Sequence, residues 1–236
     1  MAGDDEALSK PEYWDEHYSK SDGDIPTHEW FRSFADLREF FRRNLFEAPG
    51  CSAADDPVIL HLGSGDSVSR LFHLPRFLPW LSRVMFQVIP LEFDSRGYTR
   101  QICVDFSTRV VEAMTERHKD KPGIDWRCLD VRNMAELADK SIGVAFDKGT
   151  LDAMIHGSPW SPPDDVRENT SKYMGEVHRL LSDDGVFLYV TFRQPHFMRI
   201  LLNEQGLWDL DLQILGANDG GLEYYGWVIR KASSQH

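Results

Sequence analysis

From residue 58 onward, short apolar runs alternate with helical patterns, and this alternation constrains the fold more than any other feature of the chain. Five runs of strand length lie at 58–62, 101–106, 124–131, 141–149 and 185–192. Three helical patterns lie at 107–120, 170–185 and 195–204. Alternating strands and helices predict an α/β fold with a mostly parallel sheet and helices on both faces. Two last strand-like runs, 209–216 and 222–231, follow each other directly and predict an antiparallel hairpin at one edge of a seven-stranded sheet.

The first strand runs into a glycine turn, in the stretch VILHLGSGDSVSR (58–70). In open α/β sheets, ligands bind beyond the carboxyl ends of the strands, where this turn is expected. The dinucleotide fingerprint GxGxxG is incomplete here, because Val68 stands where the third glycine belongs. No GK[ST] follows, so a phosphate-binding P-loop is excluded. The turn alone leaves a structural role and a ligand role equally open.

Acidic residues at the ends of three predicted strands change that balance. Asp105, Asp130 and Asp147 stand at or just beyond the second, third and fourth strands. Three acids in successive turns of one sheet indicate a single cleft lined at its rim. An acid after the second strand typically accepts both hydroxyls of a ribose, and one after the third can accept from the amine of adenine. Because the turn contains no basic residue, a nucleoside without phosphate fits better than a dinucleotide.

Length and composition favour one domain over the whole chain, 1–236. A chain of 236 residues with 42% hydrophobic content can bury a sizeable core. Its first 50 residues form an N-terminal segment with an aromatic stretch, 13–18, and a helix expected at 30–44. We find no internal repeat and no low-complexity tract.

The formal net charge of −12 argues against nucleic acid as the main partner. A basic partner and simple solubility both agree with it. The three cysteines lack CxxC spacing, and no HxxxH or HExxH pair offers a metal site. The chain begins without the features of a signal peptide, and no apolar run reaches the roughly 20 residues of a membrane span. We therefore expect no membrane segment and a cytoplasmic location, with presence in the nucleus left open.

Several short segments of the chain resemble the class I S-adenosylmethionine-dependent methyltransferases. They are YWDEHY (13–18), HEWF (28–31), LHLGSGDS (60–67), VDFS (104–107), LDVR (129–132), FDKGTLDA (146–153), EVHRLLSDDG (176–185) and PHF (195–197). More narrowly, the chain resembles the eukaryotic lysine methyltransferases that act on translation elongation factor one-alpha. The resemblance covers most of the chain in the right order, and YWDxxY with DKGTLDA is fairly specific for that subfamily. It implies a Rossmann-like sheet, the cofactor S-adenosylmethionine, and a protein substrate with a basic site.

The resemblance also implies roles for individual residues. Gly63 and Gly65 would let the backbone approach the methionine part of the cofactor, and Asp105 would hold the ribose. Aromatic residues of the N-terminal segment, 1–50, would close over the cofactor. The cofactor-binding residues that the resemblance implies are Trp14, Tyr18, Trp30, Gly63, Ser64, Gly65, Asp105, Phe106, Ser107, Asp130, Val131 and Lys148.

A purely structural role remains an alternative to ligand binding or catalysis for several residues. The three aromatic residues of the N-terminal segment also fit plain anchors to the core. Lys148 fits a solvated lysine, Asp147 a structural role, and Asp152 a helix cap. His178 lies in an amphipathic helical pattern and is expected to be packed or exposed rather than catalytic.

Residues 71–98 depart from the resemblance. Between Gly65 and Asp105 lie 39 residues, 66–104, whereas the relatives have a much shorter connection. The insertion fits either an excursion that packs on the core or an apolar surface for a partner or a second copy.

In-line methyl transfer mainly needs alignment and exclusion of water, and the sequence names no general base and no catalytic residue. Methylation of a protein lysine is the first hypothesis. The insertion keeps two alternatives open: a small-molecule methyltransferase, and a partner-binding regulatory protein that retains the fold.

Overall fold

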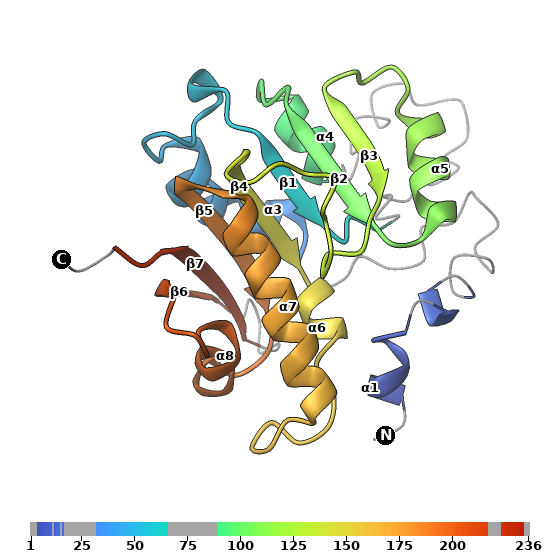
Figure 1. Ribbon diagram of the computed structural model, residues 1–236. Helices are drawn as coiled ribbons and strands as arrows, with labels where there is room; N and C mark the ends of the chain where they lie inside the picture. Colours follow the sequence, from blue (N-terminus) through green and yellow to red (C-terminus); the bar gives the residue numbers. More distant parts are fainter. Residues whose placement is uncertain are drawn as a thin grey trace.

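The computed structural model describes residues 4–10, 12–14, 16, 32–65, 89–216 and 223–233 (Figure 1). Within them, one sheet contains the seven strands β1 (Ile59–Leu62), β2 (Gln101–Asp105), β3 (Ile124–Cys128), β4 (Ile142–Lys148), β5 (Leu181–Thr191), β6 (Trp208–Leu215) and β7 (Tyr224–Lys231). The strand order is β3-β2-β1-β4-β5-β7-β6. The first five strands along the chain pair in parallel, and β7 is antiparallel to both β5 and β6. The predicted fold class, with its antiparallel C-terminal edge, is confirmed.

Helices cover both faces of this sheet (Figure 1). They include α3 (Phe34–Phe41), α4 (Ile89–Asp94), α5 (Thr108–Arg117), α6 (Thr150–Ala153), α7 (Asp164–Leu180) and α8 (Pro195–Leu202), with the π-helical segment η1 (Arg42–Phe46) and the 3-10 turn η2 (Ala53–Asp55). The short helix α1 (Asp4–Ala7) lies to the side of the sheet (Figure 1). Successive residues of a strand point to opposite faces. In β1, Leu60 and Leu62 therefore pack on the side of α6, α7 and α8, whereas Ile59 packs on the side of α3 and α4. No helix among the described residues is long and apolar enough to span a membrane.

The long helix expected at 170–185 has different ends. α7 begins at Asp164, directly after Pro162 and Pro163, and acidic residues occupy its first turn, where the helix dipole favours them. It ends at Leu180, because Leu181 already pairs with Ile142 in the sheet. The prediction that Gly185 stops the helix is therefore wrong, since Gly185 lies inside β5.

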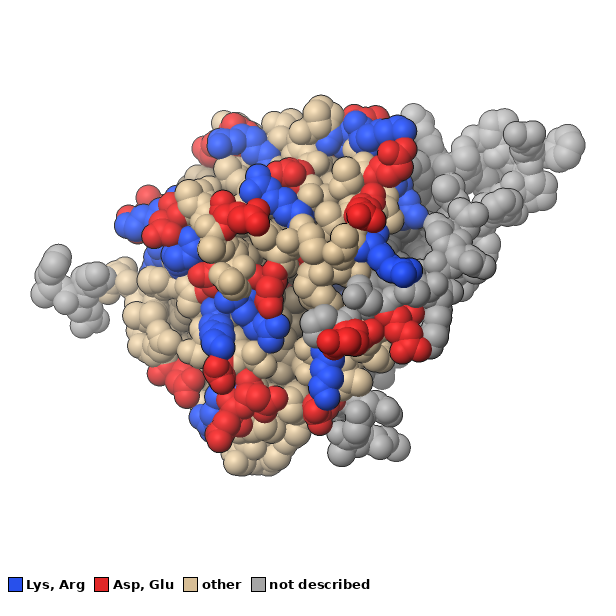
Figure 2. Space-filling model, turned by 45° about the vertical axis from the view of Figure 1, so that its right-hand side comes forward, with Lys and Arg blue, Asp and Glu red and all other residues tan. Residues whose placement is uncertain are grey.

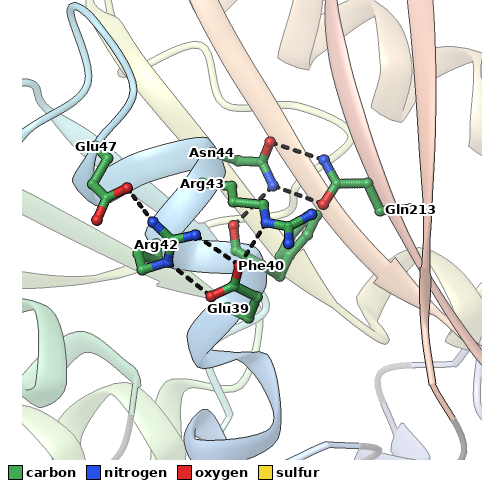
Figure 3. A network of polar contacts seen from close by, with 7 residues as sticks. All are labelled: Glu39, Phe40, Arg42, Arg43, Asn44, Glu47 and Gln213. Carbon is green, nitrogen blue, oxygen red and sulfur yellow. Dashed lines mark hydrogen bonds and ion pairs between the residues drawn. The ribbon is translucent and has the colours of Figure 1, made fainter.

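The helix expected at 30–44 is α3, which η1 continues to Phe46 (residues 30 and 31 lie outside the described ones). Figure 3 shows how this part of the chain is fixed to the sheet. The side-chain amides of Asn44 and Gln213 in β6 donate to each other, at 3.1 and 3.0 Å, and Asn44 also donates to the carbonyl oxygen of Phe40. Ion pairs around Arg42 lie on the exposed side, where such pairs add little stability. The half-buried amide pair therefore fixes the N-terminal helix to the edge of the sheet.

The insertion at 71–98 falls partly outside the described residues, which resume at residue 89. The last part of the insertion forms α4 and packs in the core against α3. The ring of Phe93 lies 5.0 Å from that of Phe41, and Gln101 of β2 donates to the carbonyl oxygens of Pro90 and Tyr98. Residues 89–98 are thus an integral layer of the fold.

Candidate functional site at the carboxyl ends of the strands

The glycine turn follows β1 at the carboxyl end of the sheet. Gly63 and Gly65 adopt φ angles of +64° and +58°, a region that favours glycine. Space is also limiting at Gly63, because a Cβ atom there would lie 1.9 Å from the hydroxyl oxygen of Thr150. Both conformation and close packing therefore require glycine at this position.

Thr150 connects this turn to the neighbouring strand β4. Its hydroxyl group donates to the carbonyl oxygen of Leu62 at 2.9 Å, and the carbonyl oxygen of Gly63 lies at 3.3 Å. Its backbone N–H donates to the carboxylate of Asp147 at the end of β4, at 2.8 Å. The turn after β1 is thus held in place by the turn after β4.

Asp105 stands at the end of β2 and is only 5% exposed. One carboxylate oxygen accepts the backbone N–H of Gly65 at 3.0 Å, and the other accepts that of Ser107 at 2.9 Å. Each carboxylate oxygen can accept more than one hydrogen bond. The carboxylate therefore braces the glycine turn from the end of β2.

Asp130, the predicted acid after the third strand, follows β3 and interacts with its neighbour Arg132. Its carboxylate accepts the backbone N–H of Arg132 at 2.8 Å and pairs with the guanidinium group at 2.7 Å. Burial works to raise the pKa of Asp130, but the hydrogen bonds from Arg132 outweigh it and hold the pKa below its ordinary value. The side chain of Val131 is buried in the core, and Phe106 is half-buried beside Asp105.

Lys148 ends β4 and lies against the start of the N-terminal helix region. Its ammonium group donates to the carbonyl oxygen of Arg32 at 3.1 Å. It is therefore a half-buried tether between the strand end and the chain before α3. This contact differs from the open expectation of a solvated surface lysine.

Of the three aromatic residues expected to cover the cofactor, only Trp14 is among the described residues. Tyr18 and Trp30 lie outside the described residues. Trp14 is described, and its indole N–H donates to the carbonyl oxygen of Leu8 at 2.7 Å, while its ring packs edge-on against Tyr13. In Figure 1 this part of the chain and α1 lie at the side of the molecule toward which β1 and β2 point.

Two buried acids below the rim belong to a network that the sequence did not reveal. Asp147 accepts the N–H groups of Thr150 and Leu151, at 2.8 and 2.9 Å, and the hydroxyl group of Tyr173 at 2.6 Å. It therefore caps α6, whereas Asp152, expected as a cap, lies inside this helix. Burial raises the pKa of Asp147 to about 7, and the nearby Asp152 adds to this rise.

Asp152 is held by the next strand. Its carboxylate accepts the hydroxyl groups of Tyr189 and Thr191 in β5, at 2.7 and 2.6 Å, and Arg193 approaches to 3.5 Å. Burial raises its pKa as well. Sequence alone offered only the spacing of the two acids in FDKGTLDA, because their tyrosine partners come from α7 and β5.

His178, the remaining candidate, lies far from the rim near the end of α7. Its ring packs edge-on against that of Trp208 at 5.0 Å, which agrees with the expected packing role. Among the described residues, no group of three or more His, Cys, Asp or Glu side chains is placed to hold a metal ion.

Comparisons with known proteins agree with this geometry. A family model described as a methyltransferase domain matches residues 88–189, from α4 to β5. EEF1A lysine methyltransferase 4 of Mus musculus is 29% identical over 222 residues, which are 93% of this chain and 74% of that protein. The protein of the same name from Bos taurus is 29% identical over 79% of this chain, and the chain spans 62% of it.

Solved structures share the fold. The 1,6-didemethyltoxoflavin-N1-methyltransferase of Burkholderia thailandensis, solved with bound S-adenosylhomocysteine, has a TM-score of 0.52 at 16% identity, over 99% of this chain and 91% of that one. The glycine turn and the buried Asp105 lie at the carboxyl ends of the strands, the edge at which open α/β sheets bind ligands. From these findings we conclude that the chain matches a methyltransferase domain over residues 88–189 and resembles S-adenosylmethionine-dependent methyltransferases in sequence and fold.

Proposed function

We propose that this enzyme methylates a lysine side chain of a protein, and that eEF1A is this substrate. The observation that carries the proposal is the hydrogen bond from the backbone N–H of Gly65 to the carboxylate of Asp105, which holds the glycine turn and this acid together at the carboxyl ends of β1 and β2. The choice of substrate is supported by the names of the two relatives compared above. The net charge of −12 favours a basic site on that partner. Such a substrate would be met in the cytoplasm.

We assign the cofactor to residues around this rim. The turn would bind the methionine part through its backbone, Asp105 would accept the ribose hydroxyls, and the segments after β2 and β3 would enclose the adenine. The full proposed set is Trp14, Tyr18, Trp30, Gly63, Ser64, Gly65, Asp105, Phe106, Ser107, Asp130, Val131 and Lys148. Support is strongest for Asp105, because it is buried at the strand end and already oriented by two backbone N–H groups.

The cofactor supplies an activated methyl group on a sulfonium, so the chain mainly has to orient donor and acceptor. A lysine with an ordinary pKa near 10.4 must lose its proton before it can attack. Exclusion of water around the ammonium group favours that loss. Asp147 and Asp152 are both buried and hydrogen-bonded below the rim, so they support the site rather than take the proton.

Transfer of a labelled methyl group to purified eEF1A tests this function. Labelled eEF1A is expected with the wild-type protein, and none when the eEF1A lysines have been chemically acetylated beforehand. Label that appears only in small molecules of a cell extract would favour a metabolite as substrate. Stable association with eEF1A in the absence of any transfer would instead favour a regulatory protein.

A further inference from the structure

Large apolar side chains are exposed beyond the carboxyl ends of β4 and β5. Trp160 lies between α6 and α7 and is 80% exposed, and Ile200 on α8 is 62% exposed. The ring of Trp160 lies 4.8 Å from that of Phe197 and 6.0 Å from that of His196. We call this surface the aromatic patch and define it by the contacting rings of Trp160, His196 and Phe197, together with the exposed side chains of Phe192, just before α8, and Ile200, on α8.

The two segments that carry the aromatic patch are fixed to each other. Arg193, at the turn into α8, donates to the carbonyl oxygens of Asp152 and Ile155 at 3.1 and 2.5 Å. The Thr191 hydroxyl group also donates to the buried carboxylate of Asp152. The loop that leads to Trp160 and the turn that carries Phe192 therefore form one preorganised unit, which lowers the entropy cost of binding.

The aromatic patch continues the rim of the cofactor site. β4 and β5 are parallel, and Lys148 lies opposite Val190 in their register. Phe192 follows two residues after Val190, so the patch begins directly beside the strand end that carries Lys148. A molecule seated on the patch would therefore reach the edge of the sheet where the methyl donor is proposed to bind.

Acidic side chains flank the aromatic patch. Asp164 and Asp165 form the first turn of α7, four and five residues after Trp160, and both are exposed. Figure 2 shows the lowest part of the molecule as a surface without charged side chains, with Asp and Glu side chains above it and Lys or Arg side chains among them. An apolar anchor beside negative charge is complementary to a protein segment with an apolar side chain next to basic residues.

We propose that the aromatic patch is the docking surface for the protein that carries the methyl-accepting lysine. An apolar side chain of that protein would pack on Trp160, and basic residues next to the target lysine would face Asp164 and Asp165. This inference rests on the proposed function for the identity of the partner. Tryptophan is enriched among the residues that dominate binding at protein interfaces, so Trp160 is expected to contribute most.

The test compares Trp160→Ala with Ile214→Ala in the full chain. Ile214 is 66% exposed on the edge strand β6, which β7 separates from β5, and serves as the control for loss of exposed apolar area outside the patch. Binding to immobilised eEF1A is measured with S-adenosylhomocysteine present, alongside the KM for eEF1A and the Kd for S-adenosylhomocysteine. Trp160→Ala is expected to raise the Kd and the KM for eEF1A at least tenfold and to leave the affinity for S-adenosylhomocysteine unchanged, whereas Ile214→Ala changes neither.

Equal eEF1A binding by wild type and Trp160→Ala would overturn the docking proposal, even if methyl transfer proceeds normally. Binding that is lost in Trp160→Ala while the wild type transfers no methyl group would uphold the docking surface and overturn the proposed function. Absence of eEF1A binding by the wild type would overturn the docking proposal, since eEF1A would then not be the partner of this surface.

The acidic flank has its own variant. Asp164→Asn is expected to weaken eEF1A binding severalfold at low salt and to reduce the dependence of the Kd on ionic strength. An unchanged salt dependence would contradict the role of this charge in docking.

Discussion

The hydroxyl group of Thr150 donates a hydrogen bond to the carbonyl oxygen of Leu62, 2.9 Å away, and so joins the turn after β4 to the end of β1. The same residue donates its backbone N–H to Asp147. The glycine turn at the proposed cofactor site therefore takes its position from a buried carboxylate on the adjacent strand. Substitutions that break this link should weaken cofactor binding more than they destabilise the fold.

Thr150→Val tests the link, because valine keeps the shape of threonine and removes its hydroxyl group. Two carbonyl oxygens at the turn would lose a donor, which costs about 1 kcal/mol or more. We expect the affinity for S-adenosylhomocysteine to fall severalfold in titration calorimetry. Thr150→Ser keeps the hydroxyl group and should bind nearly as well as wild type. Equal affinities for Thr150→Val and wild type would refute the positioning role.

Gly63→Ala is expected to destabilise the protein. A methyl group there would clash with Thr150, and the positive φ adds strain of about 1 kcal/mol or more. Gly216→Ala is the control, because nothing lies within 4 Å of its added carbon. Urea denaturation should show a loss of stability for Gly63→Ala alone. Adding Thr150→Ala should restore part of that loss, and no restoration would mean that the clash is not its source.

Asp147→Asn should cost more stability at pH 5 than at pH 8. Burial raises the pKa of Asp147 to about 7 from an ordinary value of 3.8, so the folded state keeps a proton that the unfolded state releases. That stabilisation is complete below pH 3.8 and is lost as the pH rises through 7. Linkage then gives a difference of about 2 kcal/mol between the two pH values, measurable by urea denaturation.

The exposed Asp183, paired with Lys140 at the surface, provides the control for this comparison. Its pKa is lowered, mainly by the hydrogen bond from Lys140, so it stays charged at both pH values. Asp183→Asn should therefore cost the same at pH 5 and pH 8. An equal cost of Asp147→Asn at the two pH values would contradict the raised pKa of Asp147.

His61 contributes a pH dependence of the opposite sign. Its ring is buried in β1 against the side chain of Gln101, at 2.8 Å, and burial lowers its pKa to about 4. Its stabilising contribution is complete above the unfolded pKa of 6.5 and is lost as the pH falls toward 4. Wild type should therefore lose about 2 kcal/mol more than His61→Gln between pH 7.5 and pH 5. Parallel stability curves for the two proteins would show that His61 does not titrate in this way.

Much of the fold could be predicted because apolar periodicity reports burial. The runs around Leu60 and Val104 are buried in the sheet as expected, and the antiparallel C-terminal pair follows from two strands without a helix between them. The start of α7 was missed because its first turns are charged, DDVRE, and carry little apolar pattern. Its end was missed because Gly185, five residues later, is a common helix stop, whereas the helix in fact ends where Leu181 pairs with Ile142.

The candidate site was predictable to a smaller extent. The predicted strand ends identified Asp105 and the glycine turn as site residues, because parallel strands bring successive turns to one edge of the sheet. The hydrogen bond of Gly65 to Asp105 joins residues that are 40 positions apart in the sequence, and that of Tyr173 to Asp147 joins residues 26 positions apart. One sequence contains no information on such pairs until the strand register is known.

The most direct test of the central claim is titration calorimetry with S-adenosylhomocysteine on wild type and Asp105→Asn. Asparagine keeps the size of the side chain but removes the charge that would accept the ribose hydroxyls. We expect the wild type to bind and Asp105→Asn to lose at least tenfold in affinity, since charge-assisted hydrogen bonds are among the stronger ones. Equal affinity in the two proteins, or no binding by the wild type at high micromolar concentration, would contradict the proposed cofactor site.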